Sequence, residues 1–248
     1  MTDPARSVSS FSATLAGVDG CRAGWIAAVG DAGMSTIRLV VGTSLASLVE
    51  QHPEVTLWAI DMPVDLPAGK PQDEGLRDCD AAARTRLGWP RSSSVFSAPP
   101  KPVLAAQSYE EACELSVALS GQKLSVQAWN LVPKVREVQA LLVERPELVG
   151  RLFETHPELC FAQMNGGKGI EASKKTPEGR ATRLRLLSAE FGQAAIRRAM
   201  ASTKGIKQVA NDDKIDALAA LSAARRHRDG QTRQVPGNAP PESPRIVY

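Results

Sequence analysis

The sequence contains no apolar run near the length of about 20 residues that a membrane-spanning helix requires. Its first residues, MTDPARSVSSFSA, also lack the apolar core of a secretory signal peptide. Both absences argue against a membrane or secreted protein. We therefore expect a cytoplasmic protein with no membrane partner.

Cysteine is scarce, and its spacing excludes two common kinds of site. The four cysteines lie far apart, at Cys21, Cys79, Cys113 and Cys160. A zinc site or a redox motif needs paired spacing, which is missing here. We expect reduced thiols with a structural role.

The sequence also lacks a dominant charge and has few aromatic residues. The formal net charge is +3, so attraction to a polyanion must come from local basic clusters. Aromatic residues make up 4% of the chain, which argues against a broad base-stacking platform for single strands. No Walker loop, Gly-x-Ser-x-Gly or dinucleotide fingerprint is present, which argues against those nucleotide-binding and serine-hydrolase classes.

What is present is enough for one large domain. The chain has 248 residues, of which 43% are hydrophobic. Residues 1–12 are polar and serine-rich, and residues 229–248 are rich in proline, glycine and polar residues. We expect both ends to be disordered and residues 13–228 to form the domain.

Local patterns predict a mixed order of strands and helices. Strands are expected at 14–18, 24–29, 36–41, 55–60 and 150–154. Helices are expected at 44–51, 72–88, 108–119, 125–144, 177–202 and 211–228. A further helix should start at Thr155-His156-Pro157-Glu158, which has the spacing of a capping box. The order predicts an α/β fold with a five-stranded mixed sheet and a helical insertion at about 62–149, between strands four and five.

Three of the predicted strands end in an acidic residue, namely Asp19, Asp61 and Glu154. Ligand sites in open α/β sheets lie at the carboxyl ends of strands, so these acids are candidates for one site. Each also has a structural alternative. Asp19 and Asp61 are also explained as turn residues, and Glu154 as a partner in a salt bridge at the sheet edge.

The last predicted helix carries three more acids. Asp212, Asp213 and Asp216 fall within an arc of about 100° on the helical wheel. Asp212 suits a helix N-cap, and Asp213 suits the first turn. Asp216 lies a turn further in and has no capping role. Three like charges on one arc repel unless water or a shared cation separates them.

Basic residues are the candidates for phosphate contacts, with solvated surface as the alternative. Those singled out are Lys134, Lys174, Lys175 and Arg180. The segment 92–101 offers hydroxyls and one aromatic ring, which suit either a substrate lid or an ordinary connection. His156 suits a helix cap or, being close to Glu154, a proton carrier.

Six motifs, in this order, resemble those of domain-of-unknown-function family 429 (DUF429), a group of predicted nucleases with an RNase H-like fold. They are GVDGCRAGW, AIDMPVDLP, QAWNLVPKVREV, ETHPELCFAQMNGG, SKKTPEGRATRL and DDKIDALAAL, and the resemblance covers roughly residues 15–227. The resemblance implies an RNase H-like sheet. The sequence departs from the minimal RNase H domain in two places. It contains the insertion, and in the helix after the third strand, where an acid is expected, Glu50 is only a loose match.

By position, the resemblance implies acidic ligands at Asp19, Asp61, Asp213 and Asp216, with Glu154 as an outer ligand or general base. Such a cluster would bind Mg²⁺ or Mn²⁺, which prefer oxygen ligands, and two ions can activate water and stabilise a departing oxygen. We therefore expect a metal-dependent phosphodiester hydrolase of the RNase H-like or RuvC-like nuclease type. Its partner would be nucleic acid or a small phosphodiester.

Two other functions fit the same residues. An actin-like ATPase also places an Asp-Gly turn after its first strand, and GVDGC would then face a nucleotide phosphate. That function predicts a doubled copy of the fold. The other is a non-catalytic pseudo-nuclease that binds nucleic acid, and metal-dependent cleavage separates it from the nuclease.

Overall fold

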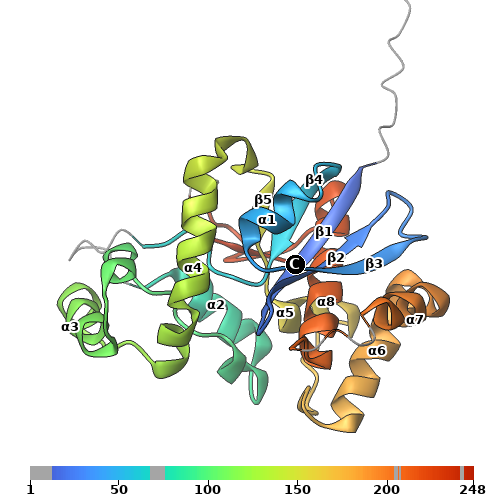
Figure 1. Cartoon of the computed structure of the whole chain (residues 1–248). Coiled ribbons are helices and arrows are strands. Elements are labelled where there is room, and N and C mark those ends of the chain that lie inside the picture. The colour runs from blue at the N-terminus through green and yellow to red at the C-terminus, as the bar shows by residue number, and fades with distance from the viewer. Residues whose placement is uncertain (1–12, 68–75, 204–205, 207, 241–242) are drawn as a thin grey trace, which may run out of the picture.

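A five-stranded sheet in the order β3-β2-β1-β4-β5 forms the centre of the protein (Figure 1). The computed structural model describes residues 13–67, 76–203, 206, 208–240 and 243–248. The strands are β1 (Thr14–Cys21), β2 (Gly24–Gly30), β3 (Ile37–Gly42), β4 (Val55–Ile60) and β5 (Leu152–Glu154). The first three are antiparallel, whereas β4 is parallel to β1 and β5 is parallel to β4. The predicted α/β class is confirmed, and the topology is consistent with an RNase H-like fold.

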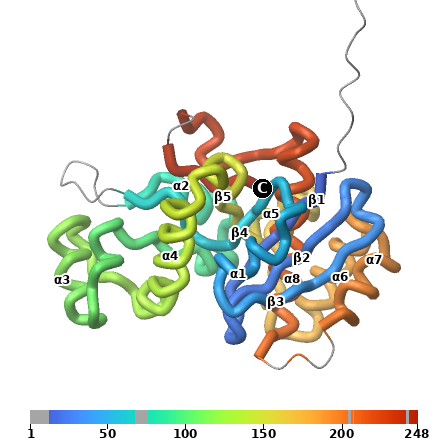
Figure 2. Tube along the Cα trace, turned by 45° about the horizontal axis from the view of Figure 1, so that its top comes forward, coloured from blue at the N-terminus to red at the C-terminus, as the bar shows by residue number. Residues whose placement is uncertain are grey.

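Helices cover both faces of this sheet (Figures 1 and 2). One face carries α1 (Leu45–Glu50) and α4 (Val126–Glu144). The other carries α5 (Pro157–Met164), α6 (Pro177–Phe191), α7 (Gln193–Ser202) and α8 (Asn211–Arg228). Successive residues of a strand face opposite sides, so each strand contributes to two apolar cores. In β1, Ala16 and Val18 belong to the α4 side and Leu15 to the α8 side.

Helix α8 packs on β1 without any side chain between the two backbones. A Cβ added at Gly17 would lie 1.9 Å from the backbone nitrogen of Leu221 and 2.4 Å from the carbonyl oxygen of Ala217. The alanine-rich sequence of α8 makes this approach possible, because Ala217, Ala220 and neighbouring alanines are fully buried with little side-chain volume. The contact fixes the N-terminal half of α8 against the end of β1.

The predicted helical insertion lies between β4 and β5. It contains α2 (Asp78–Leu87), η2 (Arg91–Ser94), η3 (Lys101–Ala105), α3 (Tyr109–Ser120), α4 and η4 (Pro146–Leu148). It has a small core of its own, to which α4 contributes Val132. The next inward positions of α4, Val135 and Val138, belong to the core of the sheet. Helix α4 therefore joins the insertion to the domain.

Two predicted helices differ from the structure. The helix expected over 177–202 is two helices, because Gly192 adopts a φ of 88° and ends α6. The capping box at Thr155 is also wrong, since His156 is the N-cap of α5. The backbone N–H of Thr155 donates to Ile60 in the sheet, so Thr155 continues the strand.

The predicted disorder of the C-terminal tail is wrong for the part that the structure describes. β6 (Gln234–Val235) and β7 (Ile246–Val247) form an antiparallel pair. Ile246, Val247 and Tyr248 are buried, because these apolar residues at the end of the chain pack on the domain. The N-terminal segment 1–12, for which disorder was expected, lies outside the described residues. Across the residues that are described, no helix is both long and apolar enough to cross a membrane.

Replacement of Gly17 by alanine tests the backbone contact. Gly17→Ala is expected to lower the free energy of unfolding by about 3 kcal/mol or more, because the new methyl group meets backbone atoms that have no room to move. Gly33→Ala is the matched control, since the nearest atom lies 3.9 Å away, and its effect should stay within about 0.5 kcal/mol. Urea unfolding measures both. Equal stabilities of the two variants would contradict the tight contact.

Candidate functional site

The sheet register brings two of the predicted acids to the same edge and the same face. Val18 pairs with Ile60, and the backbone N–H of Asp61 donates to Val18 at 2.9 Å. Asp19 and Asp61 are therefore the first residues beyond that pair on adjacent parallel strands. Their side chains alternate with those of Val18 and Ile60, which belong to the α4-side core. Both acids face α8.

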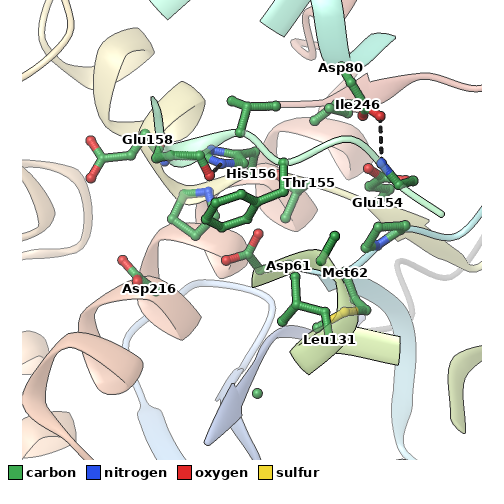
Figure 3. Close-up of a pocket in the computed structure, with 18 of the residues that line it drawn as sticks. Asp61, Met62, Asp80, Leu131, Glu154, Thr155, His156, Glu158, Asp216 and Ile246 are labelled. Atoms are coloured by element: carbon green, nitrogen blue, oxygen red, sulfur yellow. Dashed lines mark hydrogen bonds between the residues drawn. The ribbon is translucent and has the colours of Figure 1, made fainter. Parts of the chain in front are cut away.

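These acids line a cavity of about 580 Å³ together with Asp216 of α8. Figure 3 shows Asp61 and Asp216 at this cavity, together with His156 and Glu154. Asp216 is 2% exposed, and Asp19 and Asp61 are half-buried. Three carboxylates from three different elements thus meet in one partly enclosed space.

Burial raises the pKa of all three carboxyls, and the charge of Asp61 adds to the shifts of Asp19 and Asp216. Burial, followed by the charges of Asp61 and Asp216, raises the pKa of Asp19 well above its usual value. Burial also raises the pKa of Asp61, against the opposing effect of His156 and Lys174. For Asp216, burial raises the pKa to about 6, although Lys174 opposes the shift. Such shifts are typical of carboxylates held together for a function.

Lys174 supplies the positive charge nearest to these acids. Its Nζ lies 2.5 Å from Oδ2 of Asp216. Burial lowers the pKa of Lys174, but the charges of Asp216, Asp19 and Asp61 outweigh it and hold that pKa above its usual value. The other oxygen of Asp216, Oδ1, is buried without a hydrogen-bond partner. Asp216 therefore has one buried carboxylate oxygen that a further cation or donor would satisfy.

The donor chemistry of the cluster fits a hard divalent cation such as Mg²⁺ or Mn²⁺. Carboxylate oxygens are the preferred ligands, and the unpartnered Oδ1 of Asp216 is one of them. Among the described residues, however, no three His, Cys, Asp or Glu side chains converge into a ready-made metal site. The ammonium group of Lys174 compensates the acids instead. The residue types fit a metal. Binding it would require the carboxylates to move closer together and the ammonium group of Lys174 to leave Asp216.

Glu154 lines the cavity but is engaged elsewhere. It pairs in register with Ile60, so its side chain leaves the sheet on the face opposite to Asp61. There, the guanidinium of Arg77 donates to both of its oxygens, at 2.6 and 2.8 Å, and the N–H of Val64 donates at 2.9 Å. Arg77 also binds Asp80 at 2.5 Å. Glu154 therefore anchors the insertion to the sheet.

Asp213 lies apart from the other three acids. Its carboxylate accepts the backbone N–H of Ala210 at 2.9 Å and so caps the start of α8. It lines a separate hollow beside Cys21 and Arg22. The capping function expected of Asp212 thus belongs to Asp213. Its charge still reaches Asp19, whose pKa it helps to raise.

His156 and Glu158 border the cavity from the start of α5. Nδ1 of His156 accepts the N–H of Glu158 at 3.2 Å, and Nε2 lies 3.3 Å from the carbonyl of Ser94. Because Nδ1 accepts, Nε2 is the ring nitrogen placed to donate to the carbonyl of Ser94. Arg183 holds Oε1 of Glu158 at 2.6 Å, while Oε2 is buried without a partner. The sequence analysis missed Glu158 because its position at the start of a helix looked purely structural.

The predicted phosphate contacts differ in where they lie. Lys174 and Lys175 line the cavity. Lys134 also lines it, but its Nζ donates to the carbonyl of Gly24 and lies 4.4 Å from the Trp25 ring. Arg180 is not among the lining residues, and its guanidinium donates to the carbonyl of Lys175. Lys174 and Lys175 are therefore the basic residues best placed for a ligand.

A family model described as Protein of unknown function (DUF429) matches residues 17–241. This match covers most of the chain and confirms the resemblance carried by the six motifs. No curated protein and no solved structure matches the chain. The family description names no activity, so the geometry of the site carries the functional assignment.

The stability of the protein should depend on pH through Asp216. Folding raises the pKa of this carboxyl from 3.8 to about 6, so its charged form costs the folded state up to about 3 kcal/mol above pH 6. The cost disappears below about pH 4, where the carboxyl is protonated in both states. Asp216→Asn is therefore expected to raise the free energy of unfolding more at pH 8 than at pH 5, as urea unfolding can measure.

Asp31→Asn is the matched control for this test. Asp31 is partly buried, but hydrogen bonds from Ser35 and Thr36 lower its pKa. Its charge stabilises the folded state above its unfolded-state pKa, so this variant should be less stable than wild type at pH 8. If Asp216→Asn destabilised the protein equally at both pH values, the repulsion between the acids would be disproved.

Proposed function

We propose that this chain, which belongs to the DUF429 family, is a metal-dependent phosphodiester hydrolase of the nuclease type. One observation carries the proposal: Asp19, Asp61 and Asp216 line a single cavity at the carboxyl ends of two parallel strands, and Oδ1 of Asp216 has no partner there. A cluster of negative charge is unfavourable without a cation. Mg²⁺ or Mn²⁺ bound by such oxygens supplies the chemistry to activate water and stabilise a departing oxygen.

The residues of the chain have distinct tasks in this proposal. Asp19, Asp61 and Asp216 would hold the metal. Lys174 keeps the cluster partly neutral in the free protein, and with a metal bound its ammonium group would be released from Asp216 to bind a substrate phosphate together with Lys175. Asp213 adds negative charge from the capped end of α8. Glu154 positions the insertion through Arg77, and it is not assigned a chemical step.

The non-catalytic pseudo-nuclease is the second candidate, and the ion pair between Lys174 and Asp216 favours it. A lysine ammonium that permanently occupied the cation position would leave a binding site without hydrolysis. The actin-like alternative has less support. The described residues form one five-stranded sheet and one two-stranded pair, so they contain no doubled copy of the fold.

Metal binding should stabilise the protein. A ligand at 100 times its dissociation constant adds about 2.7 kcal/mol, which corresponds to a rise of about 5–10 °C in melting temperature for a chain of this size. We expect that rise with Mg²⁺ or Mn²⁺ relative to EDTA. Asp61→Asn should abolish it, whereas Asp31→Asn should keep it, because Asp31 does not line the cavity. Identical melting curves of wild type with metal and with EDTA would argue against a metal site.

Cleavage is the decisive measurement. With Mn²⁺ or Mg²⁺, the protein is expected to cleave at least one member of a panel of DNA, RNA, hybrid and small phosphodiester substrates. Asp19→Asn should lower the rate by at least about a hundredfold, because asparagine keeps the size of aspartate but lacks the charge that binds the metal. Asp31→Asn should retain full activity. Binding of nucleic acid without any metal-dependent cleavage would establish the pseudo-nuclease instead.

A further inference from the structure

The wall of the cavity opposite the sheet comes from the insertion. Arg91, Ser93 and Ser94 of η2 line it, and Phe96 and Ser97 follow. A simple RNase H-like sheet, without an insertion, would leave its carboxyl edge open. Here the insertion partly encloses this edge around a space of about 580 Å³, which is within the range of about 300–1,000 Å³ that holds one small ligand.

Arg91 is a cation without a partner at this wall. Its Nε is buried and makes no hydrogen bond, and no acid in the described part of the chain forms an ion pair with it. The other arginine of the cavity, Arg77, is fully engaged by Glu154 and Asp80. A buried guanidinium nitrogen left without an acceptor is unfavourable, and a phosphate oxygen satisfies it with charge-assisted hydrogen bonds. Arg91 therefore points to an anionic ligand.

Phe96 offers a flat apolar surface in the same wall. Its side chain is 40% exposed, and it takes part in none of the aromatic or cation–π contacts found among the described residues. The cavity also has apolar lining from Met62 and Leu131, and in Figure 3 Asp61 lies between these residues and Asp216. The space thus combines a charged part with an apolar part that contains a free ring.

We infer that the cavity takes one unpaired nucleotide at a time, with its base stacked on Phe96 and an adjoining phosphate bound by Arg91 and the exposed Lys175. The inference rests on the proposed function and specifies its substrate class as single-stranded nucleic acid or an unpaired strand end. A nucleotide is the unit that carries both a flat apolar base and a phosphate. One ring stacks one base, so the low aromatic content of the chain is no obstacle.

The partly enclosed cavity also predicts that a duplex is a poor substrate. A nucleotide within a duplex must leave the stack before it enters a closed site, and unstacking and unpairing require free energy. A strand that is already unpaired avoids that step. The protein is therefore expected to discriminate by strand state, through the cavity wall, and not by reading base edges in a groove.

Binding of labelled oligonucleotides tests the inference separately from catalysis. The protein is the full chain carrying Asp19→Asn, in EDTA, so that no cleavage occurs. The probes are a fluorescein-labelled thymidine hexanucleotide, its RNA counterpart and a hairpin duplex whose loop is replaced by a non-nucleotide linker, and binding is followed by fluorescence anisotropy. The single strands are expected to bind at least tenfold more tightly than the hairpin.

Variants of the wall identify the residues responsible. Phe96→Leu should weaken single-strand binding by about fivefold to a hundredfold, whereas Phe96→Tyr, which keeps the ring, should bind like the parent. Arg91→Ala should weaken binding and reduce the slope of log K against log salt by about 0.7, as expected for one phosphate on a single strand. Arg145→Ala is the matched control, because Arg145 does not line the cavity. Melting curves confirm that each variant is folded.

The outcomes separate this inference from the proposed function. A hairpin that binds as tightly as the single strands, or Phe96→Leu and Arg91→Ala variants that bind like the Arg145→Ala control, would overturn the inference. Equal cleavage of single strands and duplex by the unmodified enzyme with Mn²⁺ would overturn it too, while supporting the hydrolase. Selective binding of single strands, dependent on Phe96 and Arg91 but without any metal-dependent cleavage, would support the inference and overturn the hydrolase.

Discussion

The close contact between the backbones of β1 and α8 determines where the site can form. Because Gly17 has no side chain, Ala217 and Leu221 of α8 approach the strand directly. Asp216 immediately precedes Ala217 and is carried to the end of the sheet, where Asp19 and Asp61 emerge from adjacent strands. A larger residue at position 17 would push the helix away and separate the acids. Gly17, two residues before Asp19, is therefore necessary for the site although it lies outside the acid cluster.

Bringing three acids together this closely opposes folding. Burial raises the pKa of each carboxyl, and the charge of Asp61 adds to the shifts of Asp19 and Asp216, so the folded state is penalised for their charge at neutral pH. The Lys174 ammonium offsets part of that penalty through its contact with Asp216. Its own side chain is 39% exposed, but the Asp216 carboxylate that it compensates is 2% exposed, so Lys174 can leave this carboxylate only when another cation replaces it. The same residue thus stabilises the free protein and borders the cavity in which we propose that substrate binds.

The sequence predicted what depends on local pattern and missed what depends on distant pairing. Strand β4 and helix α8 lie where periodicity placed them, and Asp19 and Asp61 meet because strand ends align at one edge. In the sheet, Glu154 pairs with Ile60, the residue before Asp61. Successive residues of a strand face opposite sides, so Glu154 points to the face opposite Asp61. No local sequence pattern reveals this pairing of Glu154. Its partner Arg77 lies 77 residues away in the chain, and nothing in the sequence links the two.

The insertion adds a wall to the carboxyl edge of the sheet. Through Val135 and Val138, α4 fills the core on one face of the sheet, so the insertion is fixed to the domain. The ion pairs of Arg77 with Glu154 and Asp80 fix the start of the insertion in the same way. The N–H of Ala98 donates to Asp80 at 2.9 Å, and this hydrogen bond holds the end of the segment that carries Phe96. The wall is therefore tied to the sheet on both sides. Glu154 and Asp80 line the cavity because they hold its wall in place, and they take no part in the acid cluster.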